Sequence, residues 1–147
     1  HLAFWRRSLY GAVAARRLGQ EIGLVQHEEA FLGGLLQDLG VLAMSQTLGD
    51  DYGLLVKQAG PEHHRLRDLE RQELQTDHAE IGSALAHQWN LPPLLVEPIR
   101  FHEEPDRAPE QLLPLIRCVA LGGRVAELFM ADDPTAALNT YYSLARR

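Results

Sequence analysis

Apolar residues recur along this chain at the spacing of one face of an α-helix. The first such row contains Trp5, Leu9 and Val13 and should end near Gly23. The same period continues to the C-terminus, and no segment alternates apolar and polar residues between hairpin turns. The pattern therefore predicts an all-α bundle of about six to eight helices. The predicted helical segments are 5–23, 28–48, 50–60, 63–75, 77–89, 94–103, 109–129 and 133–147.

Several boundaries of these segments carry their own local signals. Asp77 and Glu80 have the spacing of a capping box, in which the first side chain satisfies unpaired amides of the helix start. Asp50–Asp51 can cap the third helix. Prolines should break the chain after Asn90, bend or restart a helix near Pro98, and occupy a first helical turn at Pro109. The glycine pairs 33–34 and 122–123 lie inside helical patterns, where close helix packing explains them best.

The segment from His63 to Gln75 is rich in charge and has few apolar anchors, the main ones being Leu66, Leu69 and Leu74. We expect a solvated helix here, with His63 and His64 facing water. Cys118 lies in an apolar run and should be an inert core residue. A single cysteine cannot form an internal disulfide, which suits a reducing compartment.

Composition narrows the class of protein. The 147 residues are 46% hydrophobic and 23% charged, which fits one globular domain with a real core. The net charge of -6, with scattered basic residues, argues against nucleic-acid binding. The chain has no apolar run long enough to cross a membrane and no secretory signal, so we expect a cytoplasmic protein. Because it begins with His1, we expect a portion of a longer protein.

Four stretches resemble motifs of the HD superfamily, in the family's order. Residues 34–40, Gly-Leu-Leu-Gln-Asp-Leu-Gly, are similar to the "GLLHDIG" motif, and 4–9 resemble the "WRHS" start. Residues 77–82, Asp-His-Ala-Glu-Ile-Gly, match "DHAEIG". The stretch from Trp89 to His102 resembles "WGLP…I.HHH". The last two motifs point to the HDOD branch, and together the four cover about residues 4–130.

The resemblance implies an HD-like helical fold and a known set of metal-ligand positions. At three of them this chain has Arg7, Gln37 and Phe101, and where a late aspartate is expected it has Ala120–Leu121. A guanidinium is permanently cationic and cannot bind a metal. Only Asp38, His78 and His102 remain at ligand positions. We therefore expect a degenerate site with no catalytic residues and no metal; if a metal does bind, these three residues would hold it.

Each remaining residue also has a structural interpretation. Asp38, expected in mid-helix, should form a buried ion pair with Arg7, since buried charges are usually paired. His78 should be a hydrogen-bonded core histidine, and His102, near a helix end, an exposed one. Gly-rich phosphate loops and nucleophile arrangements are absent from the sequence.

The resemblance implies a non-catalytic bacterial signalling or protein-interaction domain, without a cofactor. The alternative is a divergent metal-dependent HD phosphohydrolase acting on a nucleotide through Asp38, His78 and His102. A third possibility is a pocket that holds a nucleotide second messenger through Arg6, Arg7 or Arg100. The chain resembles only the C-terminal, HD-like half of an HDOD domain. Apolar residues around the first helix should therefore face a protein partner or a second copy of the chain.

Overall fold

The protein is all-helical over the part that the structure describes, which comprises residues 2–131 together with 135, 138, 139 and 143 of a computed structural model. The main elements are α1 (Leu2–Glu21), α2 (His27–Leu36), α3 (Leu39–Leu48), α4 (Asp50–Ala59), α5 (His63–Leu74), α6 (His78–Gln88), α7 (Pro93–Phe101), the 3-10 turns η1 (Pro105–Arg107) and η2 (Glu110–Leu112), and α8 (Leu113–Met130). The helix expected over 133–147 lies almost wholly outside the described residues.

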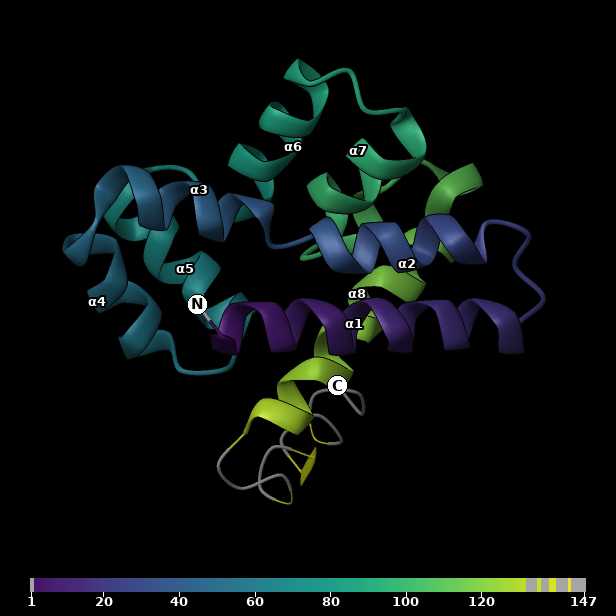
Figure 1. Ribbon diagram of the computed structural model, residues 1–147, viewed down its shortest axis with the longest axis horizontal. Helices are drawn as coiled ribbons and strands as arrows, with labels where there is room; N and C mark the ends of the chain where they lie inside the picture. Colours follow the sequence, from purple (N-terminus) through teal and green to yellow (C-terminus); the bar gives the residue numbers. More distant parts are fainter. Residues whose placement is uncertain (1, 132–134, 136–137, 140–142, 144–147) are drawn as a thin grey trace.

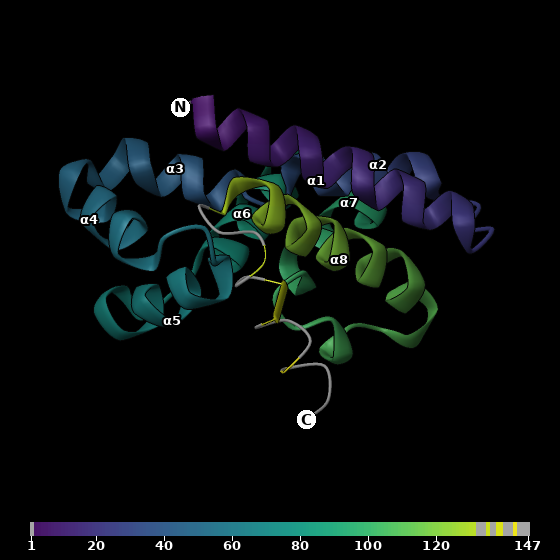
Figure 2. The same cartoon turned by 90° about the horizontal axis from the view of Figure 1, so that it is seen from below.

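Helices α1, α2 and α8 form one packed group (Figures 1 and 2). Small residues let their backbones approach closely: a Cβ added at Gly34 would lie 2.8 Å from Ala12 Cα, and one at Gly122 would lie 2.5 Å from the Gly11 carbonyl oxygen. The glycine pairs therefore serve close helix packing, as the sequence predicts. The core of this group contains the buried residues Ala15, Ala30, Leu115 and Cys118.

Two further clusters complete the interior. The helices α3, α4 and α5, which lie together on one side in Figure 1, bury Val41, Met44, Tyr52, Ala59 and Leu66. The pair α6 and α7 buries Ala86, Val96 and Ile99. Helix α6 also packs on α3. The described part of the chain thus contains three apolar clusters, and the buried charged residues described below link the helices that form them.

The single long helix predicted over 28–48 is wrong, because α2 ends at Leu36, Asp38 lies outside helical geometry, and the chain restarts as α3 at Leu39. No local breaker marks this point. Gly40, just after the break, contacts the carbonyl of His78, so tertiary packing against the start of α6 accounts for the break.

Of the other predicted helix boundaries, one is confirmed and several are wrong. Asp77 caps α6, accepting a hydrogen bond from the Glu80 amide at 2.8 Å, as predicted. Helix α7 continues through Pro98 rather than restarting there. Pro109 precedes η2, and it is Pro114 that lies in the first turn of α8. The N-cap of α4 is Gly49, so Asp50 and Asp51 lie inside its first turn. No helix in the described part is long and apolar enough to span a membrane.

Candidate functional site: a buried charged centre

Arg7 and Asp38 form the buried ion pair that the sequence predicts. Arg7 Nε donates to Asp38 Oδ2 at 2.8 Å, and both side chains are almost fully buried. The same guanidinium donates from Nη2 to Glu127 Oε1 at 3.2 Å and from Nη1 to the Pro61 carbonyl at 3.4 Å. Arg7 therefore ties α1 to the α2–α3 junction, to α8 and to the loop before α5.

Asp38 directs its other oxygen toward three histidines. It occupies the N-cap position of α3, not the middle of a helix as expected. Its Oδ1 lies 3.0 Å from His63 Nδ1, 3.8 Å from His102 Nε2 and 4.0 Å from His78 Nε2. Burial alone would raise the pKa of Asp38, but His63 and Arg7 outweigh it and hold that pKa well below its usual range. Asp38 is therefore ionised.

The expectation that His63 is solvated is wrong. His63 is buried at the start of α5, where its amide donates to Glu127 Oε1 at 3.1 Å. Burial, and then the charge of Arg7, lower the pKa of His63. Its Nδ1 donates to Asp38 Oδ1 at 3.0 Å. Contacts from α3 and α8, distant in sequence, remove this residue from water.

His78 is the hydrogen-bonded core histidine that the sequence predicts. Its side chain is fully buried, with Nδ1 2.8 Å from Glu70 Oε2 and Nε2 3.2 Å from Glu103 Oε1. The His78 amide also donates to Glu70 Oε2, at 2.9 Å. Burial opposes protonation, but the hydrogen bonds to Glu103 and Glu70 outweigh it and raise the pKa of His78 to about 10.

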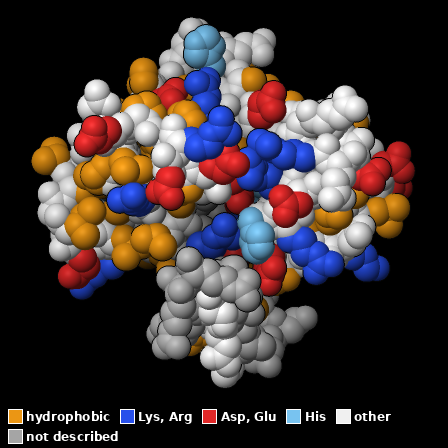
Figure 3. All heavy atoms as spheres, turned by 180° about the vertical axis from the view of Figure 1, so that it is seen from behind, with side chains coloured by type: hydrophobic (Ala, Val, Ile, Leu, Met, Phe, Trp, Pro, Cys, Tyr) orange, Lys and Arg blue, Asp and Glu red, His pale blue; other side chains and the backbone are white. Residues whose placement is uncertain are grey.

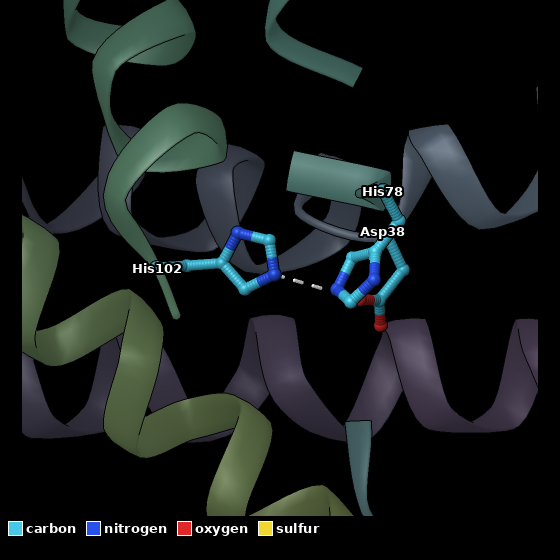
Figure 4. A group of neighbouring side chains, drawn as sticks. All are labelled: Asp38, His78 and His102. Atoms are coloured by element: carbon cyan, nitrogen blue, oxygen red, sulfur yellow. Dashed lines mark ion pairs between the residues drawn. The ribbon is translucent and has the colours of Figure 1, made fainter. Parts of the chain in front are cut away.

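His102 follows α7 and is buried, which corrects the expectation of an exposed residue. Its Nδ1 lies 2.7 Å from the Ile99 carbonyl oxygen. Because a carbonyl can only accept, Nδ1 carries a hydrogen, and Nε2 is the nitrogen that faces the centre. That Nε2 is buried without a hydrogen-bond partner among the described residues, and it points toward Asp38 (Figure 4).

Gln37 and Phe101, the other two residues of the expected degenerate site, lie in different places. Gln37 is buried beside the centre, and its Nε2 donates to the Gly34 carbonyl at 3.2 Å. Phe101 instead lines a separate cavity of about 420 Å³ together with Arg67, Arg100 and Arg107. The structure therefore brings Arg7, Gln37, Asp38, His78 and His102 together and leaves Phe101 outside.

Three buried acidic residues of the centre were missed by sequence reasoning. Glu70 accepts a hydrogen bond from the Tyr52 hydroxyl at 2.6 Å while it holds His78. Glu103 lies between His78 and His102, and Glu127 joins Arg7 to His63. Glu127 could have been found, because it is a lone carboxylate in the apolar run of α8. Glu70 lies on the same face of α5 as Leu66, which also indicates burial. Glu103 is followed by Glu104, and its neighbours in the sequence do not indicate burial.

A divalent metal, which the HD superfamily uses, is compatible with three of these side chains. One ligand atom from each of Asp38, His78 and His102 can be chosen so that all lie within 4.8 Å of one another, and Figure 4 shows the three side chains directed inward. The unpartnered Nε2 of His102 supports the same fit. The adjoining cavity, lined in part by Arg7, Gln37 and Glu127, measures about 10 Å³, less than one water needs.

The sequence and the fold agree on the family. The family model of the HDOD domain matches residues 1–105. An uncharacterised protein of Treponema pallidum is 32% identical over 111 residues, covering 72% of this chain and 21% of its own length. The chain thus spans about a fifth of that relative.

Solved structures give the same result. A proposed phosphohydrolase from Shewanella amazonensis superposes with a TM-score of 0.71 at 28% identity, over 88% of this chain and 47% of its own. The MmoQ response regulator from Methylococcus capsulatus has a TM-score of 0.70 at 27% identity, over 89% of this chain and 51% of its own. An HDOD domain protein of unknown function from Geobacter sulfurreducens, at 20% identity and a TM-score of 0.64, shares the fold. The chain spans about half the length of these structures. With four motifs in order, an HD-like helical fold and a family model that matches most of its length, this chain belongs to the HDOD domain family.

Proposed function

We propose that this domain is a non-catalytic signalling module of the cytoplasm that binds protein through α1. The observation that carries the proposal is a row of exposed apolar side chains on this helix. Leu2, Trp5, Leu9 and Val13 are 74%, 55%, 52% and 47% exposed. Their spacing of three and four residues places them on one face of α1, the face turned away from α2 and α8. Contiguous apolar surface of this kind marks an interaction site.

The surface charge supports protein rather than nucleic acid as the partner. Figure 3 shows basic and acidic side chains interleaved across one broad face, without a continuous basic stripe. Examples are the ion pairs of Arg67 with Glu104 and of Arg117 with Asp106. Together with the net charge of -6, this mixture offers little attraction to a phosphate backbone.

The closed state of the charged centre supports the absence of hydrolysis. A phosphohydrolase must admit a phosphate ester and a water to its ligands. Here His78 is fully buried, the guanidinium of Arg7 holds Asp38, and the adjoining cavity is about 10 Å³. A larger cavity of about 310 Å³ is lined in part by His102, Glu103 and Leu121, but the Nε2 atom of His102 is itself buried.

The alternative function, a divergent phosphohydrolase, is favoured by the convergence of Asp38, His78 and His102. A metal bound there would polarise a phosphoryl group and activate water. Assays with phosphomonoesters, cyclic nucleotides and cyclic dinucleotides, with added Mn²⁺ or Zn²⁺, separate the two functions. We expect no turnover above that of Asp38→Asn. Turnover that is abolished in Asp38→Asn would establish the alternative.

The proposed interface is tested by self-association, using two exposed tryptophans as a matched pair. Trp5 lies in the apolar row of α1, and Trp89, 57% exposed, lies at the end of α6. Sedimentation velocity at rising concentration should show the wild type and Trp89→Glu associating, whereas Trp5→Glu stays monomeric. A wild type that remains monomeric at high micromolar concentration, with tryptophan fluorescence unchanged on dilution, contradicts self-association through α1.

A further inference from the structure

The cavity that Phe101 lines contains a cluster of four arginines. It measures about 420 Å³, a volume typical of sites for small organic molecules. Its guanidiniums come from three parts of the chain, with Arg67 and Arg71 on α5, Arg100 on α7 and Arg107 on η1. These four residues lie outside the buried centre around Asp38, so the structure of that centre does not account for the cluster.

Two carboxylates of the protein pair with these arginines as a bound acid would. Glu104 lies between two of them, with Oε1 2.6 Å from Arg67 Nη2 and Oε2 3.0 Å from Arg107 Nη1. Asp77 Oδ2 accepts from Arg67 Nε at 3.3 Å and from Arg71 Nε at 2.8 Å. The Asp77 side chain is 4% exposed and fixed as the cap of α6, whereas that of Glu104 is 36% exposed. The Glu104 carboxylate can therefore turn outward, and that of Asp77 cannot.

The arginines of the cavity keep N–H groups that the protein does not use. Among the described residues, Arg71 donates from Nε alone, which leaves both of its Nη groups available. Arg100 Nη1 lies 3.6 Å from Glu97 Oε1, which is too far for a hydrogen bond. A guanidinium carries five N–H groups in a planar fork and binds acidic oxygens in pairs. The cavity is therefore rich in donors for an anion.

The other acidic residues of the cavity oppose an anion only weakly. Glu103 Oε1 is held on the side of the buried centre, 3.2 Å from His78 Nε2 and 3.4 Å from His102 Nε2. Glu80 is exposed, so water and salt screen its charge. When Glu104 turns outward, all four arginines of the cavity present free donors.

We infer that this cavity binds a small organic acid with at least two carboxylates, one of which replaces the Glu104 carboxylate between Arg67 and Arg107. The displaced group is itself a carboxylate, which favours the same group in the ligand. A second acidic group is needed because the exchange of one carboxylate for another adds no ion pair, while the ligand loses translational freedom on binding.

The second carboxylate and the carbon skeleton also have partners in the cavity. Arg71 and Arg100 supply the unused N–H groups for the second carboxylate. Phe101 and Ala84 line the same cavity and offer apolar surface to the carbons between the acidic groups. The cavity is formed by α5, α6, α7 and η1 and is separate from the apolar row on α1. It therefore gives the module a small-molecule ligand in addition to the proposed protein partner.

The experiment is a titration of the whole chain with succinate, glutarate and citrate at fixed ionic strength, followed by amide NMR spectra. Acetate and inorganic phosphate are titrated in parallel. We expect saturable shifts of the Ala79, Ser83 and Ala84 amides, whose residues line the cavity, with at least one of the three acids. Acetate should not saturate these shifts, because it has one carboxylate.

Glu104→Gln should bind the same acid about three- to five-fold more tightly, because its side chain no longer competes as an anion. Asp106→Asn is the matched control. It removes an exposed carboxylate of the same turn, but this carboxylate pairs with Arg117, outside the cavity. The affinity of the control should differ from that of the wild type by less than about two-fold.

Arg107→Gln tests the cluster from the opposite direction. The Arg107 side chain is 71% exposed, so the variant should keep the fold, which thermal unfolding checks. Loss of this guanidinium should weaken binding at least about five-fold, since it removes charge-assisted hydrogen bonds to the ligand.

Three results would overturn the inference. The first is the absence of saturable shifts with any of the three acids up to about 10 mM, in both the wild type and Glu104→Gln. The second is an equal change of affinity in Glu104→Gln and Asp106→Asn, which indicates a general effect of charge. The third is saturation by inorganic phosphate alone, which indicates a site for a phosphate group. The wild-type titrations decide the third without any variant.

Discussion

Arg7 Nε and Asp38 Oδ2 lie 2.8 Å apart in the interior of the protein, joining the first helix to the junction of the second and third. Removing one partner of such a pair leaves a buried charge without full compensation. Asp38→Asn should therefore lower the free energy of unfolding by about 3–5 kcal/mol, as measured by urea denaturation.

The control for this variant is an exposed ion pair on the same helix, between Arg17 Nη2 and Glu21 Oε1 at 2.7 Å. Glu21→Gln should cost less than about 1 kcal/mol, and added salt should reduce that cost further. If Asp38→Asn costs no more than Glu21→Gln, the Arg7–Asp38 pair does not contribute as a buried interaction.

Two helical glycines should respond to alanine with opposite signs. A Cβ at Gly40 would overlap the His78 carbonyl, so Gly40→Ala should force α3 and α6 apart and cost several kcal/mol. Gly53 lies inside α4 with nothing near its virtual Cβ, so Gly53→Ala should raise the unfolding free energy by about 0.5–1 kcal/mol. Thermal and urea unfolding of both variants measure the difference. A mild Gly40→Ala effect would contradict the close approach of α3 and α6.

Asp77 should make stability depend on pH. Burial opposes ionisation, but the Glu80 amide, Arg71 and further neighbours lower the pKa of Asp77 below its ordinary value of 3.8. Its charge therefore contributes stability at pH values above the ordinary value, and this contribution is lost as the pH falls through the lowered pKa. Asp77→Asn keeps a capping side chain but loses the charge.

The measurement is the urea midpoint of wild type and Asp77→Asn between neutral and acidic pH. The wild type should be the more stable near pH 7, and the difference should shrink as the pH falls below about 4. A difference that is constant over this range would show that the Asp77 charge contributes nothing. Asp77→Ala should cost about 0.5–2 kcal/mol at neutral pH through loss of the cap.

Cys118 should be unreactive in the native protein. Its side chain is buried in the cluster between α1, α2 and α8, and burial raises the pKa of the thiol. A small thiolate fraction and poor access both slow alkylation. Labelling with a maleimide, followed by mass spectrometry, should be slow in buffer and fast in denaturant. Rapid labelling in buffer would indicate local opening around α8.

Local signals in the sequence predicted those features that depend on neighbouring residues. The helical period gave the all-α class, and the Asp77–Glu80 spacing gave the cap of α6. The Arg7–Asp38 pair was also predictable, because two family motifs place these residues together and one has gained a cation where a ligand is expected.

The features that the sequence did not predict depend on distant contacts. The break at Gln37–Asp38 arises where Gly40 meets α6, and the sequence around it contains no breaker. His63 and Glu103 look like solvated residues because their neighbours in the chain are charged. They are buried by α3, α6 and α8, which approach them only in the folded protein.

The position of Glu127 near the end of the described chain has a consequence for how the domain is made. Glu127 accepts from Arg7, 120 residues earlier, and from the amide of His63, 64 residues earlier. During synthesis the N-terminal helices emerge first, so these donors wait for their acceptor until α8 has left the ribosome. In a nascent chain that stops after α7, the guanidinium of Arg7 can pair with Asp38 but not with Glu127. Burying Arg7 in that state would be costly. The domain can reach its final packed state only once α8 has been translated.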